Sequence, residues 1–518
     1  MSRTKQYDAD IVIIGYGPGG VVAANVLGKL GVSAIALERY KDIYSRARAV
    51  TVNDWTMRIF QSLGLDAQMK KIMDVTHSLR WVDYQGGELM SMPFPPGEFG
   101  HAVSYAIYQP EMEKVLRTAA EKYLTVRVHY GDEMTGIVQD EDGVTVTVKS
   151  GDTGEIGQLR AKYALACDGG SSRTRELLGI NLIGDTLPVR WVVIDCRVKR
   201  WWPNRHMLTF WSDKQRPVVD IALAMGNHRW EFPLNPGESE ADFQTGEQLW
   251  KLLKSLGVTE EEVEIHQHAF YNHHVRHAER WREGRVFLCG DAAHLMPPWA
   301  GSGMQSCIRD TQNLCLKLVE VLAGRLPESV LDTYESERAP DVERYTQISV
   351  GMGRIIKREL SDGQIDAMME AERASGVLPV ALRPPHYREG WLQVGKGSRE
   401  VVGKLLPQPL VANCRGQLGL LDDLLGEGIV LLGAEVDPAR RLNPEQMAAW
   451  KRLGARFVAL RAVGQHARSD SDLIDIDGKM IAWLERNGVD VVAVRPDKIV
   501  MAASGNLSVP ALASGVAP

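Results

Sequence analysis

The first forty residues alternate between apolar and glycine-rich segments in a pattern that predicts a strand, a turn, a helix and a second strand. Residues 11–14 are four consecutive aliphatic side chains, as in a strand that is buried on both faces. A glycine turn follows at 15–20, residues 21–30 have the pattern of a helix, and the apolar run 33–37 ends at Glu38. This order predicts a βαβ unit.

The glycine turn has the spacing of a dinucleotide-binding loop. We expect Gly15 to make the tight turn, Gly17 to let a pyrophosphate approach the backbone, and Gly20 to let helix and strand pack closely. The helix N-terminus offers unpaired N–H groups to phosphates, and Glu38 is placed to accept hydrogen bonds from a ribose. Two flanking positions complete this set of candidate cofactor residues: Pro18 and Arg39. The pattern leaves NAD, NADP and FAD open.

Two later apolar runs end at acidic turns. Residues 163–166 precede Asp168, and residues 285–289 precede Gly290 and Asp291. Each carboxylate is therefore expected at the C-terminal end of a strand, where open α/β sheets place their ligands. A carboxylate can accept hydrogen bonds from a polyol such as a ribityl chain; the alternative is an ordinary turn in which Asp291 caps a helix. Together with the N-terminal unit, these turns favour FAD.

A loop over residues 299–303 leads into a predicted helix over residues 304–318. The free N–H groups at the start of such a helix can stabilise negative charge on a reduced flavin ring. Three candidate cofactor contacts therefore lie here: Gly301, Gly303 and Met304.

Strand-like alternation of apolar and polar residues dominates the segments between these motifs. It predicts a mixed or antiparallel sheet that forms the floor of a substrate pocket. The expected strands are residues 80–84, 190–198, 217–224, 229–233 and 263–271. Three arginines of this region are candidate anchors for a substrate carboxylate: Arg190, Arg216 and Arg229.

The pattern restarts near residue 405, after a proline- and glycine-containing stretch that predicts a linker. Strands are expected at 429–432, 457–460 and 489–494, and a helix at 444–453. No C-x-x-C pair occurs there, so a packing or dimerisation role is expected in place of a redox role.

These runs predict an α/β chain in three parts. A discontinuous Rossmann-like FAD domain is expected over residues 1–70, 100–180 and 276–375, and a β-sheet substrate domain over residues 71–99 and 181–275. A linker over residues 376–404 precedes a C-terminal domain over residues 405–518.

Composition agrees with a soluble enzyme, which is expected in the cytoplasm. The formal net charge of −6 over 518 residues argues against nucleic acid as the main partner. No apolar run reaches the roughly 18 residues of a membrane span, and residues 1–8 are polar, unlike a secretory signal. The six cysteines, several of them in apolar runs, are expected to be reduced thiols.

Five stretches resemble, in this order, the class A flavoprotein aromatic hydroxylases, which are single-component FAD monooxygenases related to p-hydroxybenzoate and phenol hydroxylases. They are residues 15–20 with Glu38, 48–50, 108–110, 168–175 and 290–318. The resemblance covers almost the whole chain. Within the family the chain is most similar to the 3-(3-hydroxyphenyl)propionate hydroxylases, at residues 166–170, 190–195, 331–334 and 494–497.

The resemblance implies a p-hydroxybenzoate hydroxylase-like fold with a thioredoxin-like C-terminal domain, assembled as a homodimer. It implies tightly but non-covalently bound FAD, O2, and NADH in preference to NADPH as a transient co-substrate. The activity implied is ortho-hydroxylation of a small phenol through a flavin C4a-hydroperoxide. The chain has one G-x-G-x-x-G, so a second Rossmann domain for the nicotinamide is not expected.

The resemblance also implies roles for individual residues. Glu38 would hold the adenosine ribose, Arg48 would contact the FAD phosphates or ring edge, and Gln109 would face the flavin. Asp168 would belong to a motif shared between FAD and NADH, and Asp291 would bind the ribityl chain.

On the substrate side, the resemblance places Pro298 and Trp299 beside the flavin. The Pro298 carbonyl would align the phenol hydroxyl while a separate group removes its proton, since free phenols titrate near about 10. The sequence does not identify that base. Water must be excluded from this chamber, because activated oxygen is otherwise lost as hydrogen peroxide.

Some residues depart from the family pattern close to the predicted flavin ring. The family often has Gln and Asn where this chain has Ser302 and Gln305, and it differs again at residues 315–318. Two alternatives therefore stay open. One is a monooxygenase of the same fold acting on a larger xenobiotic or polyketide, and the other is a non-catalytic flavoprotein that mediates assembly.

Histidines alternate along the last strand of the predicted substrate sheet, at His266, His268 and His274, and His273 and His277 lie close by. No acidic or cysteine partner is spaced with them, so no metal site is predicted. Period-two polarity is also how a strand faces solvent, and some of these rings can instead border an aromatic substrate.

Overall fold

The computed structural model describes residues 7–512 apart from 45–47, 362, 365–366, 368–369, 371–383, 396 and 468. A parallel sheet in the order β8-β2-β1-β11-β18 forms its base. Its members are β1 (Ala9–Ile14), β2 (Ala34–Glu38), β8 (Val126–Tyr130), β11 (Ile156–Ala166) and β18 (Val286–Leu288). The helix α1 (Pro18–Lys29) connects β1 to β2, so the predicted βαβ unit is confirmed.

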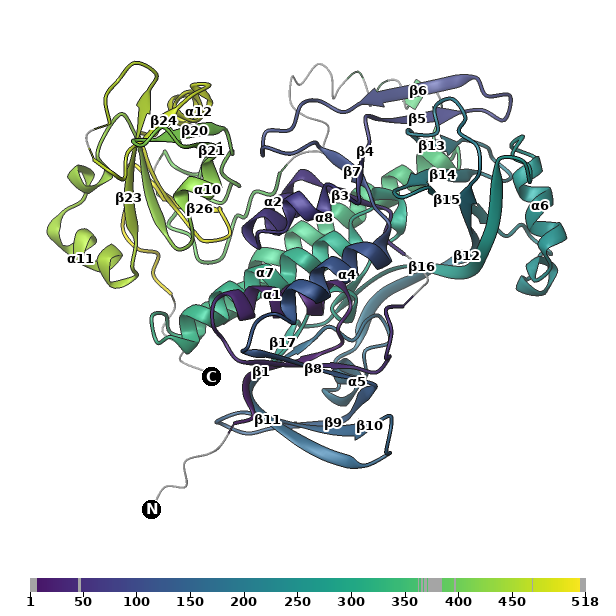
Figure 1. The fold of residues 1–518 in the computed structure, drawn as a ribbon, viewed down its shortest axis with the longest axis horizontal. Helices are drawn as coiled ribbons and strands as arrows, with labels where there is room; N and C mark the ends of the chain where they lie inside the picture. The colour runs from purple at the N-terminus through teal and green to yellow at the C-terminus, as the bar shows by residue number, and fades with distance from the viewer. Residues whose placement is uncertain are drawn as a thin grey trace.

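Helices cover one face of this sheet and a β-ribbon covers the other (Figure 1). The helices are α1, α4 (Gln109–Ala120), α7 (Gly303–Leu322) and α8 (Thr333–Ile356). The ribbon consists of β9 (Asp132–Gln139) and β10 (Val144–Ser150), which pairs with the first half of β11. Val12 and Ile35 of the sheet pack against Val144 and Val146 of the ribbon, so both faces of the sheet are buried.

A second, mixed sheet lies beyond the helices, at the upper right of Figure 1. Its order is β19-β16-β12-β15-β14-β13-β5-β6, in which only β5 and β13 run parallel. Its strands are β5 (Ser78–Val82), β6 (Glu88–Pro93), β12 (Leu182–Val198), β13 (Leu208–Trp211), β14 (Val218–Leu223), β15 (Asn227–Pro233), β16 (Val263–Ala278) and β19 (His294–Leu295).

Alternation along these strands gives the mixed sheet two different faces. Val193, Val219 and Phe210 point to the cavity described below, while Ile194, Val218 and Trp230 pack against α6 (Gly246–Lys254) on the other side. The mixed sheet expected from the sequence is confirmed, but β12 and β16 are longer than predicted. Their extra residues pair across a register shift between Thr186 and Arg190, which the apolar pattern does not reveal.

A small sheet that the sequence did not predict joins the two larger ones. It contains β3 (Thr51–Asn53), β7 (Ser104–Ala106) and β4 (Asp74–Val75). The helix α2 (Asp54–Ser62) starts directly after β3, and α3 (Asp66–Met69) follows it. This arrangement brings the start of α2 close to the substrate sheet.

The C-terminal unit contains its own sheet, in the order β21-β20-β24-β23-β22-β25-β26. The strands are β20 (Leu410–Asn413), β21 (Leu418–Leu420), β22 (Val430–Ala434), β23 (Arg456–Ala462), β24 (Leu473–Asp475), β25 (Val491–Val494) and β26 (Val500–Ala503). The helices are α10 (Leu421–Leu425), α11 (Pro444–Arg452) and α12 (Lys479–Arg486). The three strands and the helix predicted here are all present, and the α/β fold is confirmed.

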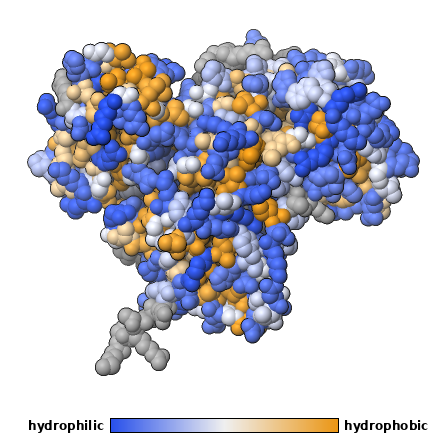
Figure 2. Space-filling model, viewed as in Figure 1, coloured by the Kyte–Doolittle hydropathy of each residue, from blue (hydrophilic) through white to orange (hydrophobic). Residues whose placement is uncertain are grey.

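Buried ion pairs and apolar contacts attach this unit to the rest of the chain. Arg58 of α2 binds both carboxylate oxygens of Asp422, at 2.5 and 2.8 Å. Arg495 binds both oxygens of Glu337 in α8, at 2.7 and 2.9 Å. The two halves therefore share one interior. On the outside, Figure 2 shows a largely hydrophilic face on which apolar residues gather over the C-terminal unit and the centre of the molecule.

Within the described residues, no helix has the length and apolarity of a membrane span. Part of the predicted linker, residues 376–383 and Lys396, lies outside the described residues, as do residues 371–375 at the end of the expected FAD domain. The domain boundaries remain a prediction.

Candidate functional site

A cavity of about 390 Å³ lies where the parallel sheet, α7 and the substrate sheet meet. At one end it is bordered by Gly17, Pro18 and Asp291, and at the other by Trp299 with the apolar floor of the substrate sheet. Its volume is in the range of ordinary cofactor and ligand pockets. The predicted cofactor motifs and the predicted substrate floor therefore face one continuous space.

The glycine turn meets the geometric demands of a phosphate-binding loop. Gly15 has φ +92°, and a Cβ there would lie 2.4 Å from the Cys167 carbonyl oxygen. A Cβ on Gly20 would lie 2.0 Å from the Gly15 carbonyl oxygen, so helix and strand require glycine there. A Cβ on Gly17, in contrast, would meet nothing within 4 Å. Gly17 thus leaves room for a ligand beside the N-terminus of α1, as FAD requires.

Glu38 and Asp168 both hold backbone turns at the ends of their strands. Glu38 is buried and accepts hydrogen bonds from the N–H groups of Tyr16 and Tyr40, each at 3.0 Å. Asp168 accepts from the Ser172 hydroxyl at 2.6 Å and from the Thr174 N–H at 2.9 Å, so it caps the turn into a short helix. The neighbouring Cys167 and Gly169 line the cavity. Arg39 lies exposed, with its guanidinium 4.8 Å from the ring centre of Tyr40.

Arg48 is held from three sides, which brings together residues far apart in the chain. Gln109 Oε1 accepts from the N–H groups of Arg48 and Ala49 at 2.9 and 2.8 Å. Arg229 Nη1 donates to the Arg48 carbonyl at 3.1 Å. The Arg48 guanidinium lies 3.3 Å from Asp291, whose charge raises the pKa of Arg48. Arg48, Gln109 and Asp291 thus surround one part of the cavity, as the resemblance implied.

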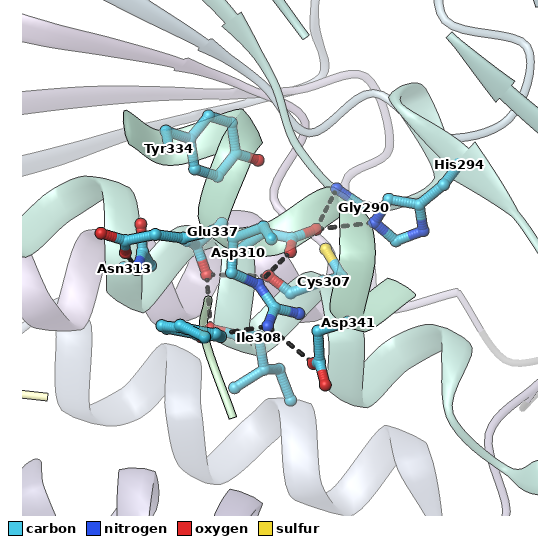
Figure 3. Close-up of polar contacts among 12 residues, drawn as sticks. Gly290, His294, Cys307, Ile308, Asp310, Asn313, Tyr334, Glu337 and Asp341 are labelled. Carbon is cyan, nitrogen blue, oxygen red and sulfur yellow. Dashed lines mark hydrogen bonds and ion pairs between the residues drawn. The ribbon is translucent and has the colours of Figure 1, made fainter. Parts of the chain in front are cut away.

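The turn at Gly290 rests on a buried polar network (Figure 3). Asp310 of α7 accepts from the Gly290 N–H at 3.2 Å and contacts His294 Nε2 at 2.7 Å. Arg338 of α8 donates to its other oxygen at 2.8 Å. Burial acts to raise the pKa of Asp310, but His294 and Arg338 outweigh it and lower that pKa. Neither Asp310 nor Arg338 was predicted; a charged residue inside the apolar pattern of the helix over residues 304–318 was the available signal for Asp310.

Three thiols line the cavity next to this turn: Cys167, Cys289 and Cys307. Cys307 Sγ lies 2.2 Å from the position that a Cβ would take on Gly290, so it fills the space that this glycine leaves. A hydrogen bond with Cys289, together with burial, raises the pKa of the Cys167 thiol well above its ordinary value. Burial does the same for Cys307.

The loop from Pro297 to Gly303 closes the cavity beside the substrate floor. The Pro298 carbonyl accepts the Gly301 N–H at 2.8 Å, which leaves it one further lone pair. Gly301 has φ +58°, and Gln305 Nε2 donates to its carbonyl at 2.7 Å. Gln305 Oε1 accepts from the Asn53 N–H at 2.8 Å, so this departure from the family pattern ties the loop to the start of α2. Five predicted residues between positions 298 and 304 line the cavity: Pro298, Trp299, Gly301, Gly303 and Met304.

The structure separates the three candidate substrate arginines. Arg229 lines the cavity, buried, and binds both oxygens of Asp195 at 2.7 and 2.9 Å. Arg190 pairs with Glu240 and Arg216 with Glu238, and neither borders the cavity as the described residues define it.

Aromatic and apolar side chains dominate the substrate end. Trp299 packs edge-on against Trp191 and His273, with ring centres 5.9 and 5.0 Å away. Burial, with Lys357 nearby, lowers the pKa of His273 to about 4, so this ring is neutral near pH 7. His274, which also lines the cavity, contacts the Thr186 hydroxyl at 2.9 Å. No group of three or more potential metal ligands was found among the described residues.

Asp54 is a cavity residue that the sequence analysis did not single out. It is the first residue of α2 and lines the cavity close to β7 and β6. Burial raises the pKa of its carboxyl group to about 7. An aspartate at a helix start usually has a capping role, so the sequence alone offers no signal that separates it from a structural residue.

Comparison with known proteins agrees with this geometry. A family model described as an FAD binding domain matches residues 8–349, and one described as the HcaD C-terminal domain matches residues 403–517. A 3-(3-hydroxy-phenyl)propionate/3-hydroxycinnamic acid hydroxylase of Burkholderia cenocepacia is 34% identical over 97% of this chain and 95% of its own. One of Mycobacterium avium is 32% identical over 97% and 90%.

Two solved structures share the fold. The flavin-dependent monooxygenase PieE, solved with FAD and substrate, superposes with a TM-score of 0.81 at 23% identity, covering 97% of each chain. Aklavinone-11 hydroxylase, solved with FAD and aklavinone, gives 0.79 at 24% identity, covering 97% of this chain and 96% of its own. Both cover the C-terminal unit as well as the cavity.

Proposed function

This chain belongs to the family of FAD-dependent aromatic hydroxylases that carry this FAD binding domain, and we propose that it ortho-hydroxylates a small phenol of the 3-(3-hydroxyphenyl)propionate type. In this proposal O2 is the oxidant and NADH, used in preference to NADPH, is the transient reductant. The observation that carries it is the single cavity shared by the glycine turn, the Asp291 turn and the apolar floor.

The residues that would hold FAD follow from the cavity wall. Gly17, with the N-terminus of α1, would receive the pyrophosphate, and Glu38 the adenosine ribose. Asp291 would bind the ribityl chain, and Arg48 would lie at the ring edge. When bound, the flavin supplies the electrons that activate O2 for transfer to the aromatic ring. We infer that Asp168 contributes indirectly to cofactor binding. It caps the turn that places Cys167 and Gly169 in the cavity wall.

On the substrate side, Pro298 would align the phenol. Its carbonyl keeps one lone pair for the substrate hydroxyl while the Gly301 N–H fixes its direction. Trp299 packs on Trp191 and His273 and shields this position from water. These contacts hold Pro298 and Trp299 rigidly, as a reaction that depends on the alignment of its substrate requires.

A second candidate substrate class is favoured by the apolar character of the floor. Arg190 and Arg216 point to other partners, and Arg229 shares its charge with Asp195. A phenol without a carboxylate, or a larger apolar one, would match a wall made of Leu79, Met92, Phe94, Phe210, Ile221 and Met352.

A matched pair of substrates separates the two. The purified yellow protein is mixed with NADH, 18O2 and either 3-(3-hydroxyphenyl)propionate or 3-propylphenol, and both NADH loss and labelled catechol are followed. The first proposal expects kcat/KM at least about tenfold higher for the carboxylated phenol. The reverse order supports the apolar class, and NADH loss without labelled product from any phenol contradicts both.

Substitution of the arginines locates the carboxylate. Arg229→Met is expected to raise KM for the carboxylated phenol alone, whereas Arg190→Ala and Arg216→Ala serve as matched controls with unchanged KM. Equal effects of all three would place the carboxylate elsewhere.

We further propose that the enzyme works in the cytoplasm as a homodimer. Light scattering after size-exclusion chromatography tests the oligomeric state.

A further inference from the structure

Asp54 stands at the junction of three elements that form the substrate end of the cavity. It follows β3 directly and opens α2, while Asn53 caps that helix by accepting the Thr56 N–H at 3.0 Å. Gln305 of α7 accepts the Asn53 N–H at 2.8 Å. The backbone that carries Asp54 is therefore held to the loop that presents Pro298.

Among the described residues, no cation forms an ion pair with the Asp54 carboxylate, in contrast to the carboxylates of Asp291 and Glu231. Its Oδ1 accepts the N–H of Trp55 at 2.9 Å. The nearest guanidinium groups are engaged elsewhere: Arg58 with both oxygens of Asp422, and Arg309 with Asn53 Oδ1 at 3.1 Å. Arg309 also stacks 4.2 Å above the ring centre of Trp55.

Two other carboxylates border the cavity, and each accompanies an arginine. Asp291 lies 3.3 Å from Arg48, and Glu231 lies 3.9 Å from Arg229. A proton acceptor must be ready to change its charge near the working pH. Burial raises the pKa of Asp54 to about 7, against the opposing effects of the Trp55 N–H, Arg309 and Arg58. Glu231, whose pKa burial also raises, is the competing candidate.

Asp54 also borders a second, much smaller space. This void of about 10 Å³, near the lower limit for one water molecule, is lined by Asp54, Pro95, Pro96, Glu98, Phe99, Val103 and Pro384. Of its lining residues, Asp54 and Val103 also line the large cavity. Pro96 and Glu98 are exposed on the molecular surface. Asp54 therefore lies between the substrate chamber and a small space whose lining includes surface residues.

We propose that Asp54 accepts the phenolic proton of the substrate and returns it to solvent through this small void. The inference rests on the proposed phenol hydroxylation. The O–H bond of the phenol breaks, its electron pair stays on the phenolate oxygen, and the proton forms a carboxyl O–H on Asp54. The carboxyl group then releases that proton to water on the side of Glu98. The ionisable groups that face Asp54 are Arg58 on α2, Arg309 on α7 and, across the small void, Glu98.

Binding to the oxidised holoenzyme tests the contact without turnover. The ionised carboxylate accepts a charge-assisted hydrogen bond from the phenol, so Kd should fall about tenfold as pH rises through 7. 3-Phenylpropionate, which lacks the hydroxyl, should show no such step in the wild-type enzyme. Flavin absorbance changes report both titrations. If the two ligands titrate alike, the contact does not exist, and this comparison needs no variant.

Two substitutions then separate the candidate bases. In Asp54→Asn the pH step in Kd should vanish and the single-turnover rate of hydroxylation should fall by about 10² to 10⁴, while reduction of the flavin by NADH is retained. In Glu231→Gln both the step and the pH profile should persist. An Asp54→Asn enzyme that keeps the step, or a Glu231→Gln enzyme that loses it, overturns the proposal. Failure of the wild-type enzyme to hydroxylate any phenol would instead refute the proposed function.

Discussion

At the scale of single residues, charged side chains around the chamber form ion pairs, and one carboxylate is instead bound by a backbone N–H group. Arg48 and Asp291 neutralise each other within the wall, and Arg229 is neutralised by Asp195 behind it. Asp54 instead keeps a carboxylate against the cavity with a backbone N–H as its hydrogen-bond donor. A group placed in this way lowers stability in one protonation state, and such a cost is typical of functional sites.

This cost predicts a pH-dependent gain in stability for Asp54→Asn. The folded-state pKa of about 7 lies above the ordinary aspartate value of 3.8, so the ionised form is disfavoured by folding. The wild-type enzyme therefore loses stability relative to the variant as pH rises from 4 to 7, by about 1 kcal/mol per pH unit, and the difference levels off above pH 7. Denaturant unfolding of the apoenzymes between pH 4 and 9 measures it. A difference independent of pH would contradict the raised pKa.

Residues whose role depends on their immediate neighbours in the sequence could be predicted from it. Residues whose role depends on contacts with distant parts of the chain could not. Gly15, Gly17 and Gly20 are readable because their turn is complete within six positions. Asp54 is positioned by Gln305, because Gln305 accepts a hydrogen bond from the neighbouring Asn53, which lies 252 residues away in the sequence. Nothing in an Asn-Asp helix start distinguishes such a residue from an ordinary cap.

At the scale of elements, the strand, turn and helix at the N-terminus form the most demanding piece of backbone. Gly20 is required by the contact between α1 and β1, whereas Gly17 lies at the helix N-cap with φ −74° and open space around its missing Cβ. Two glycines three residues apart therefore differ in their surroundings: Gly20 is required for packing, and Gly17 is the one proposed to make room for the cofactor phosphates.

Alanine at these two positions should have separable effects. Gly17→Ala is compatible with the backbone, so the apoenzyme should unfold at an unchanged temperature while FAD binds at least about tenfold more weakly. Gly20→Ala forces a Cβ against the Gly15 carbonyl, which should cost about 1–3 kcal/mol of stability or more. Scanning calorimetry of the apoenzymes and FAD titration measure the two quantities. Loss of stability in Gly17→Ala would show that its space is not open.

Element boundaries in the substrate sheet were harder to predict than element existence. All five expected strands are present, yet β12 starts at Leu182 and β16 ends at Ala278. Their extensions are mostly half-buried or exposed, so they lack the alternation that marks a buried strand. The small sheet of β3, β7 and β4 was missed for a similar reason, because strands of two or three residues are too short to show an alternation of apolar and polar side chains.

At the scale of the whole molecule, the C-terminal unit is bound to the flavin half through α8. Glu337 accepts hydrogen bonds from Arg495 of the C-terminal unit and from Lys317 of α7, the latter at 2.8 Å. The next residue, Arg338, holds Asp310 and through it the Gly290 turn. The contact between the two halves at Glu337 is therefore adjacent in sequence to Arg338, which supports the Gly290 turn.

Breaking this buried pair should destabilise the whole chain. Arg495→Met leaves Glu337 short of a buried partner and should cost about 3–5 kcal/mol. Arg441→Met, which removes an arginine paired with Asp490 on the surface of the same unit, should cost about 0–1 kcal/mol. Thermal unfolding at fixed FAD concentration compares them, because ligand concentration shifts the midpoint. Equal midpoints for the two variants would show that the buried pair does not join the halves.

The thiols around the Gly290 turn bear on how long such an enzyme survives its own chemistry. Any turnover in which the oxygen is not transferred releases hydrogen peroxide beside Cys167 and Cys307. Peroxide reacts with thiolates, and the raised pKa of both groups keeps them protonated at neutral pH. These two thiols are thus poor targets for peroxide, and the oxidisable groups that remain in the wall include the methionines Met92, Met296, Met304 and Met352.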